Sequence, residues 1–373
     1  MLKRKLHVHL DGKGSAACER LAAILVNDAA LRAQYDVSLS MAGGGLLNEG
    51  HSHVYNLDSK HLGGLNGMLE LAGFFRKIRP DIVHIISPEL SGMVPCAARL
   101  AGAQLVVHTI ARGTQEKLHA STVGKLASAI AEDVLVAASD VTRRKLQQQS
   151  GLGNRGKIPV IYADISVPFR AASAAHLRAR MGLPQGQLLF AADLSVDSSH
   201  ALERLVKVFA RLRSRIFFQA MPVLAVCGLP GHRMAAAART AERHGLNEEI
   251  IFYGADESAR EAAAACDVFV FPCAGHGDFQ PSVLAAMAGG KTVVAVRDGM
   301  MPELLEGGKS GLLAKPGDEE SLYRALELVI NDTDLKVKMG YAAKNRFESN
   351  FKTGSTAKAY LKIYDGTQAG VLA

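Results

Sequence analysis

The residues best suited to phosphate chemistry form a glycine-rich loop near the start of the chain. The segment Gly12-Lys13-Gly14-Ser15-Ala16-Ala17 follows a predicted strand, opens a predicted helix and fits the pattern G-x-G-x-x-G/A. In that pattern the backbone amides at a helix N-terminus approach a phosphate group closely. A dinucleotide dehydrogenase also needs a carboxylate near the end of the second strand, which here reads Leu39-Ser40-Met41-Ala42-Gly43. The missing carboxylate argues against a bound NAD.

Histidines recur at alternating positions of two predicted strands. His7 and His9 share one face of the first strand, and His51 and His53 share a face of another. A metal site would need a third ligand and a carboxylate behind the ligands, and neither pattern supplies them. We therefore expect exposed histidines or histidines with satisfied hydrogen bonds, and no metal.

The composition is that of a globular protein with an anionic partner. The 373 residues are 48% hydrophobic and 21% charged, with a net charge of +7 and a pI of about 9.1. This balance suits nucleic acid, an acidic membrane surface or a phosphorylated ligand. Tryptophan is absent and aromatic residues make up 6% of the chain, which argues against stacking on nucleic-acid bases.

The cysteines and the apolar runs indicate the compartment. Five cysteines at unrelated spacings, none in a C-x-x-C pair, argue for a reducing environment and against a structural zinc site. No apolar run approaches the length of about 18 residues that would span a membrane. We expect a cytoplasmic protein, and peripheral attachment at the inner face of a membrane stays open.

Short apolar runs alternate with longer helical patterns, which predicts β-α-β units, parallel sheets and an α/β fold. The length suits two domains, with a boundary near 165–169. The predicted strands are Leu6–Leu10, Val37–Met41, His53–Leu57, Ile82–Ile86, Gln104–His108, Asp133–Ala137, Lys157–Tyr162, Leu188–Ala191, Val223–Cys227, Ile250–Tyr253, Val268–Phe271, Thr292–Val296 and Leu312–Ala314.

Motifs in the last third of the chain resemble glycosyltransferase family 4. Ala286-Met287-Ala288-Gly289, Pro302-Glu303 and the glycine-flanked Gly308–Leu313 keep the order and spacing of that family's E-A-M-A-x-G, G-G-x-P-E and G-x-x-G-L-L motifs. Two earlier segments, 79–92 and 134–146, resemble first-domain strands of the same family. The resemblance covers most of the chain and is specific in its C-terminal third.

The resemblance implies a GT-B fold, in which two Rossmann-like domains face each other across a cleft and a C-terminal helix crosses back to the first. The implied domains are an acceptor domain at 1–166, a nucleotide-sugar (donor) domain at 167–350 and the returning helix at 351–373. The implied reaction moves a sugar, with retention, from a nucleotide-sugar to a polysaccharide, lipid-linked or cell-envelope acceptor. The nucleotide-sugar is a substrate there, and the resemblance implies no metal and no other cofactor.

Several side chains of the family's donor site are replaced in this chain. The two glutamate positions fall on Gly277 and Ala285, neither of which accepts a hydrogen bond through a side chain. The arginine and lysine positions fall on Asp193 and Ser198, and an aspartate beside a diphosphate repels it. The histidine expected after the fifth strand is also missing from the stretch 108–113.

Two hypotheses follow from these departures. In the first, which we favour, the protein is a hexosyltransferase-type enzyme that contacts its donor through other groups. In the second, it is a catalytically inactive GT-B protein that acts as a binding or regulatory partner of an active glycosyltransferase. No catalytic residue is assigned. The candidate donor-binding residues are Gly14, Arg112, His276, Gly277, Asp278, Phe279, Gln280, Pro281, Ser282 and Ala285, with His200, Arg204 and Lys207 as further candidate replacements for the lost cations.

Basic groups of the predicted first domain suggest a second kind of partner, an anionic membrane surface. Phe74-Phe75-Arg76-Lys77 with Arg79, and Arg143-Arg144-Lys145, suit an anionic membrane surface, where each cation contributes about 1 kcal/mol. A solvated basic surface explains the same residues. A protein partner or a homo-oligomer stays open, and nucleic acid is not expected.

Overall fold

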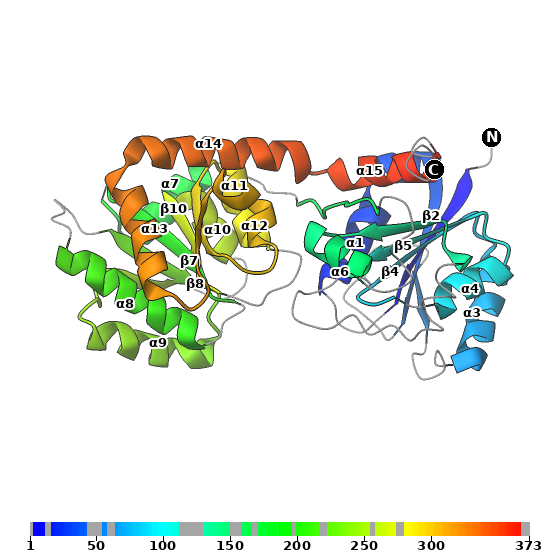
Figure 1. Ribbon diagram of the computed structural model, residues 1–373, viewed down its shortest axis with the longest axis horizontal. Helices are drawn as coiled ribbons and strands as arrows, with labels where there is room; N and C mark the ends of the chain where they lie inside the picture. Colours follow the sequence, from blue (N-terminus) through cyan, green and yellow to red (C-terminus); the bar gives the residue numbers. More distant parts are fainter. Residues whose placement is uncertain are drawn as a thin grey trace. The chain divides into compact units, whose positions relative to one another are not determined.

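The computed structural model divides the chain into two compact units. Unit 1 comprises 1–164, 277–279 and 353–373, and unit 2 comprises 165–276 and 280–352. The structure describes residues 3–11, 16–42, 54–57, 64–90, 92–111, 130–148, 158–165, 171–184, 186–195, 199–215, 222–253, 258–273 and 280–366. Figure 1 shows both units as α/β folds.

Unit 1 is built on a parallel sheet of six strands in the order β3-β2-β1-β4-β5-β6. Its elements, in chain order, are β1 (Arg4–Leu10), α1 (Ala16–Asn27), α2 (Ala29–Gln34), β2 (Tyr35–Ala42), β3 (Val54–Leu57), α3 (Gly64–Ile78), β4 (Ile82–Ser87), α4 (Met93–Leu100), β5 (Leu105–Ile110), β6 (Val134–Ala137), α6 (Asp140–Gln148) and α15 (Ser355–Tyr364).

Unit 2 has a second parallel sheet of six strands, in the order β12-β11-β10-β7-β8-β9. Its elements are α7 (Ala171–Arg180), β7 (Leu189–Asp193), α8 (Ser199–Arg215), β8 (Val223–Cys227), α9 (Gly231–Arg243), β9 (Ile250–Tyr253), α10 (Ser258–Ala265), β10 (Val268–Phe271), α11 (Pro281–Ala288), β11 (Thr292–Val296), α12 (Met301–Leu304), η2 (Glu306–Gly308), β12 (Leu312–Ala314), α13 (Glu319–Asn331) and α14 (Thr333–Asn350).

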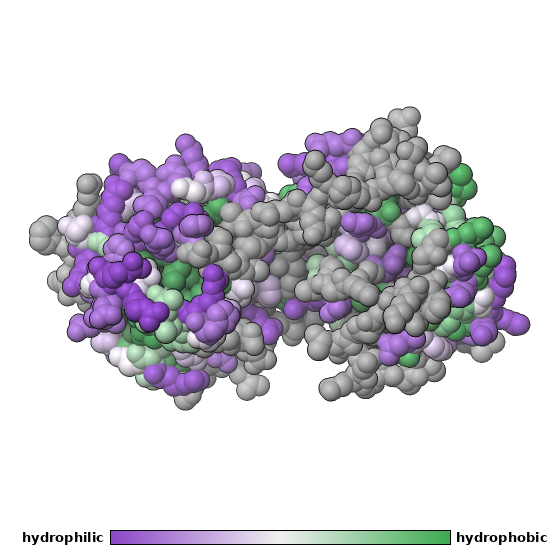
Figure 2. All heavy atoms as spheres, turned by 90° about the horizontal axis from the view of Figure 1, so that it is seen from below, coloured by the Kyte–Doolittle hydropathy of each residue, from purple (hydrophilic) through white to green (hydrophobic). Residues whose placement is uncertain are grey.

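Helices α3 and α4 pack side by side on one face of the first sheet. They bury Leu71, Phe75 and Val94 against the strands, but they leave apolar side chains exposed on the opposite side. Figure 2 shows hydrophobic surface on the side of unit 1 where these helices lie. The exposed apolar residues of the two helices are Leu65, Leu69, Met93 and Leu100.

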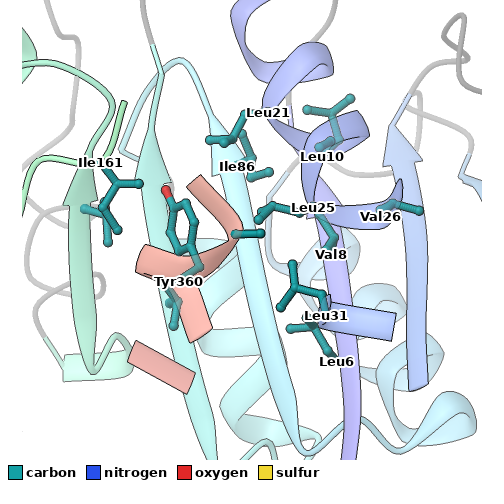
Figure 3. Close-up of a cluster of buried hydrophobic side chains, with 14 of the residues drawn as sticks. Leu6, Val8, Leu10, Leu21, Leu25, Val26, Leu31, Ile86, Ile161 and Tyr360 are labelled. Carbon is teal, nitrogen blue, oxygen red and sulfur yellow. The ribbon is translucent and has the colours of Figure 1, made fainter. Parts of the chain in front are cut away.

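Helices α1, α2 and α15 contribute to the larger core of the first sheet (Figure 3). Leu21 and Leu25 of α1 pack on strand residues such as Val8 and Ile86 because buried parallel strands are apolar on both faces. Tyr360 of α15 joins the same core although it lies near the end of the chain. Helix α15 therefore completes the core of unit 1.

The predicted α/β fold with parallel sheets is confirmed, and most predicted strands lie within two residues of the observed ones. The expected strand Lys157–Tyr162 is wrong for the part that the structure describes, where Val160 makes only an isolated bridge to Ala137. The residue pattern does not predict helix α14. Its buried residues, Met339, Ala343 and Phe347 at spacings of four with Gly340, form a stripe too narrow for a clear amphipathic pattern.

Candidate functional site

The structure describes some of the predicted donor-binding residues. Gln280, Pro281, Ser282 and Ala285 lie at the start and on the body of α11 in unit 2. The remaining candidates lie outside the described residues: Gly14, Arg112, His276, Gly277, Asp278 and Phe279.

Helix α11 begins where its sequence predicts a helix start. Pro281 occupies the first helical turn, where its fixed φ suits the helix and its missing N–H costs no hydrogen bond. Gln280 is the N-cap, and its backbone oxygen accepts a 3.1 Å hydrogen bond from the amide of Leu284. The Gln280 side chain makes no capping hydrogen bond and is 6% exposed, while Ala285 is fully buried.

Asp193, which the predicted family resemblance aligns with an arginine, binds the start of α11. Asp193 ends β7 and is 5% exposed. Its Oδ2 accepts a 2.5 Å hydrogen bond from the Ser282 hydroxyl, and its Oδ1 accepts a 2.9 Å bond from the backbone amide of Ser195. The N-terminus of a helix favours negative charge, so this carboxylate occupies a favourable position.

A glycine on the neighbouring strand end makes room for this turn. Gly228 follows β8 with a φ of +79°, and a Cβ there would lie 2.6 Å from the Ser195 amide nitrogen and 2.7 Å from Asp193 Oδ1. The turn from Asp193 to Ser195 therefore packs directly against the backbone of Gly228.

The topology places this cluster where α/β sheets bind ligands. The chain runs from β7 through β8 to β9 on one side of the sheet and from β10 through β11 to β12 on the other. Ligands of such sheets bind beyond the carboxyl ends of the strands at this reversal. Asp193 is the last residue of β7, and α11 comes directly after β10 in the chain, so both lie at this reversal.

The cations suggested as replacements lie on α8, which follows β7. Lys207 is 3.0 Å from Glu203 and 4.0 Å from Glu319, so its charge is already compensated. His200 is exposed and Arg204 half-buried. The structure brings none of these three into a hydrogen bond with Asp193 or Ser282, whose described partners are named above.

Unit 1 contains a polar network that was not predicted as a site. Four buried histidines, His7, His9, His84 and His108, are fully enclosed among its strands. On the face covered by α3, His7 contacts the hydroxyls of Ser38 at 2.8 Å and Ser40 at 2.7 Å, and His9 Nδ1 contacts Ser40 at 2.7 Å. The His9 Nε2 atom is buried without a hydrogen-bond partner. The expectation that every such histidine is exposed or satisfied is thus wrong for His9.

Burial favours the neutral forms of His7 and His9. It lowers the pKa of His7 well below its usual range, and His9 adds to the effect. Burial also lowers the pKa of His9, where the charge of Asp11 acts in the opposite direction and that of His108 in the same direction. Taking a charged imidazole out of water is costly, so the neutral form is favoured.

His108 connects a hydroxyl to a carboxylate in the order of a serine–histidine–acid triad. Its Nδ1 lies 2.5 Å from Glu132 Oε1, and its Nε2 lies 2.7 Å from Ser87 Oγ. However, Ser87 donates its only hydrogen to the backbone oxygen of Glu89 at 2.5 Å. His108 Nε2 must then carry a hydrogen and donate to Ser87, which is the reverse of the direction that activates a serine nucleophile. This group therefore has a structural role, joining β5 to Glu132.

His84 fastens α15 to the opposite face of the sheet. Its Nδ1 lies 2.6 Å from the Tyr364 hydroxyl and its Nε2 lies 2.8 Å from Thr109 Oγ1, which in turn lies 2.8 Å from the Tyr360 hydroxyl. Burial lowers the pKa of His84 to about 3. Both ring nitrogens are satisfied, and the side chain has a structural role.

The described part of the chain contains neither a metal-binding group nor a membrane-spanning helix. No group of three or more His, Cys, Asp or Glu residues there is arranged to hold a metal ion. In the same residues, no helix combines the length and apolar character needed to cross a bilayer.

Comparisons with known proteins agree with this architecture. Residues 185–332 match the family model described as Glycosyl transferases group 1. The chain is 29% identical over 306 residues to a D-inositol 3-phosphate glycosyltransferase of Streptomyces avermitilis, covering 76% of this chain and 65% of that protein. It is 32% identical over 123 residues to the N,N'-diacetylbacillosaminyl-diphospho-undecaprenol alpha-1,3-N-acetylgalactosaminyltransferase of Campylobacter jejuni, covering 32% of each.

Solved structures share the fold over almost the whole chain. A glycosyltransferase from Rickettsia africae has a TM-score of 0.80 at 16% identity, covering 97% of this chain and 98% of that one. Anabaena Alr3699/HepE, solved in complex with UDP, has a TM-score of 0.76 at 19% identity, covering 97% and 100%.

The predicted GT-B fold is therefore confirmed, and so is the resemblance to glycosyltransferases at the level of group 1. The match spans 65% of the Streptomyces avermitilis protein, less than two thirds of its length. Assignment to family 4 in particular stays a prediction.

Proposed function

We propose that the protein is a glycosyltransferase that moves a sugar from a nucleotide-sugar, with retention, to a polysaccharide, lipid-linked or cell-envelope acceptor. The observation that carries this proposal is the position of α11. This helix starts beyond β10 at the reversal of the second sheet, within the segment that matches group 1 glycosyltransferases. The names of two relatives, an inositol phosphate glycosyltransferase and a diphospho-undecaprenol-linked sugar transferase, support a phosphorylated or lipid-linked acceptor.

The donor site of this proposal lies at the start of α11. A departing nucleoside diphosphate needs donors and positive potential, which the first turn of a helix supplies. Gln280 adds a side chain that makes no capping hydrogen bond, and we propose that it contacts the donor together with residues 276–279. Ala285 is fully buried on α11 and would support that turn from behind.

The test is nucleotide binding by calorimetry, with UDP, GDP and ADP and their common sugar conjugates. Submillimolar affinity for one base, followed by release of that nucleotide from its sugar conjugate in the presence of an acceptor extract, supports the enzyme. Failure to bind any of them at millimolar concentration rejects the proposal. The Gln280→Ala variant then separates a donor contact from a structural N-cap, because only a contact changes nucleotide affinity without changing the melting temperature.

A second function, a catalytically inactive partner of an active glycosyltransferase, is favoured by the Asp193–Ser282 hydrogen bond. An internal carboxylate already occupies the side-chain position that faces the start of α11, where an anionic ligand would gain most. This hypothesis expects no nucleotide binding and a stable complex with a homologous protein that does bind nucleotide. Co-purification of the tagged protein from its source, followed by nucleotide binding by the complex, distinguishes the two functions.

We also propose peripheral contact with an anionic membrane through α3 and α4. Leu65 and Leu69 of α3 are 68% and 53% exposed, and Arg76 and Lys77 follow in its last turn. Exposed apolar side chains beside cations suit the interface of an anionic bilayer. Two of the expected groups contribute less: Phe75 is buried in the core, and Arg143 and Arg144 both pair with Asp140.

A further inference from the structure

The unpartnered nitrogen of His9 lies at the reversal point of the first sheet. The chain runs from β1 through β2 to β3 on one side and from β4 through β5 to β6 on the other, so the carboxyl ends of β1 and β4 meet where parallel sheets bind ligands. His9 is the penultimate residue of β1, and half-buried Asp11 follows the strand. A polar atom buried without a partner is energetically costly, and a ligand that binds it recovers that cost.

The surroundings of His9 fit a neutral ligand with more than one hydroxyl. Among the residues that the structure describes, Asp11 and His108 are ionisable groups whose charges, besides that of His7, reach His9. The Asp11 carboxylate repels an anion and accepts hydrogen bonds from hydroxyls. The ring of Phe75 meets the His9 ring edge-on at 5.9 Å and supplies an apolar wall on the α3 side.

The hydrogen bonds behind His9 let its free nitrogen act in either sense. The Ser40 hydroxyl has one hydrogen, so it donates to either His7 Nε2 or His9 Nδ1 and accepts from the other. If it donates to His9, the neutral His9 carries its hydrogen on Nε2. If it donates to His7, His9 Nε2 is an acceptor. This series of hydrogen bonds ends at Ser38, which also lines a surface pocket. Solvent can therefore meet the change at its far end when the direction of the hydrogen bonds is reversed.

We propose that His9 Nε2 and the Asp11 carboxylate form a binding site for adjacent hydroxyls of a neutral sugar or cyclitol. A hydroxyl both donates and accepts, which matches an imidazole that can present either a hydrogen or a lone pair. As the place where the acceptor of the transfer binds, the site rests on the proposed function. Binding of a polyol at this site does not depend on whether the protein also binds a nucleotide-sugar.

The test follows the ring nitrogens of ¹⁵N-histidine-labelled protein by NMR while methyl α-D-glucopyranoside, myo-inositol or glycerol is added at millimolar concentration. We expect one of the two cyclic probes to shift the Nε2 signal of His9 and glycerol to act more weakly. His84 is the internal control because both of its nitrogens are already bonded, so its signals stay in place. If no probe shifts the signals of His9 or of His84, the proposal is overturned. A bound water is then the partner of His9.

Two variants check that the response belongs to this site. In His9→Asn the amide takes the place of Nδ1 and keeps the contact with Ser40, but no atom replaces Nε2. We expect binding of the cyclic probe to weaken by about tenfold, the equivalent of one hydrogen bond of about 1.4 kcal/mol. Asp11→Asn, at a half-buried position, keeps the side-chain shape but removes the charge, and is expected to weaken binding as well.

Unchanged affinity in both variants overturns the proposal. Calorimetry with UDP and GDP is run on the same samples. Loss of polyol binding with nucleotide binding retained, or the reverse, shows which of the two proposals fails.

Discussion

The carboxylate of Asp193 and the hydroxyl of Ser282 are 2.5 Å apart, although the two residues lie 89 positions apart in the sequence. The bond joins the end of β7 to the first turn of α11 at the reversal of the second sheet. The Asp193 carboxylate is thus held at the start of α11 by a specific hydrogen bond, where the predicted family resemblance expects an arginine. Any anion that binds at the start of α11 must do so beside a carboxylate that is already bonded.

Asp193→Asn tests whether this carboxylate limits nucleotide binding. Removing one negative charge about 4 Å from a diphosphate is worth about 1 kcal/mol even in a water-like environment, so affinity for UDP or GDP is expected to rise at least about fivefold. The loss of charge-assisted hydrogen bonds should lower the free energy of unfolding by about 1.5–3 kcal/mol. Calorimetry measures the first quantity and urea denaturation the second.

Ser282→Ala is the matched control for that change. It removes the donor hydroxyl but keeps the charge of Asp193, so stability should fall by about 1–3 kcal/mol while nucleotide affinity does not rise. If Asp193→Asn instead weakened nucleotide binding, Asp193 would be a contributor to the donor site, and its charge would not be the obstacle.

Gly228→Ala tests the packing that holds the turn after β7. Its Cβ would approach the Ser195 amide nitrogen to 2.6 Å, and its φ of +79° disfavours any side chain. We expect the free energy of unfolding to fall by about 3 kcal/mol, in the range of a backbone clash at a strained position. Gly231→Ala, where nothing lies within 4 Å, should change stability little. If urea denaturation gave equal effects for the two substitutions, the turn from Asp193 to Ser195 would shift to make room for the Cβ without loss of stability.

Apolar runs bounded by turn residues predict the strands well, because strands of a parallel sheet are buried on both faces. Val268–Phe271 and Thr292–Val296 illustrate this, since every residue of both strands is buried. The stripe of α14 is too narrow to stand out against its charged residues. Val160 lies in an apolar stretch but has a single bridge partner, which the local sequence does not reveal.

The site is less predictable because its contacts depend on which strand ends meet. The motif order places Asp193 at the family's arginine position, but it does not show that Ser282 is its partner. Likewise, the alternation of His7 and His9 predicts a shared face, whereas the hydroxyl between them comes from Ser40 on the neighbouring strand. That β1–β2 register leaves His9 Nε2 unpaired.

Substitution of two exposed leucines tests the membrane contact. Burial of a leucine side chain is worth about 1.5–3 kcal/mol, so Leu65→Gln with Leu69→Gln should weaken binding to phosphatidylglycerol-containing vesicles by at least about tenfold. The control pair, Val337→Gln with Tyr341→Gln on α14, is similarly exposed and should leave vesicle binding unchanged. Co-sedimentation measures both. No binding of the unmodified protein to vesicles, or equal loss in both pairs, would contradict the contact.

The buried His84 makes stability depend on pH in a defined window. Burial lowers its pKa to about 3 in the folded protein, against about 6.5 in the unfolded chain. Between these values the unfolded chain binds the extra proton, so the free energy of unfolding rises with pH through the window and falls as the solution is acidified below about pH 6.5. The contribution of this one group reaches about 1.4 kcal/mol per pH unit well inside the window.

Urea denaturation between pH 5 and pH 6.5 should therefore show a shallower slope of unfolding free energy against pH for His84→Gln than for the unmodified protein. Tyr364→Phe removes the hydroxyl bonded to His84 Nδ1 but keeps the imidazole, so it should lower stability and retain the slope. An equal slope in all three proteins would mean that His84 is protonated in the folded state, and that its two hydrogen bonds, to Tyr364 and Thr109, are made by an imidazolium.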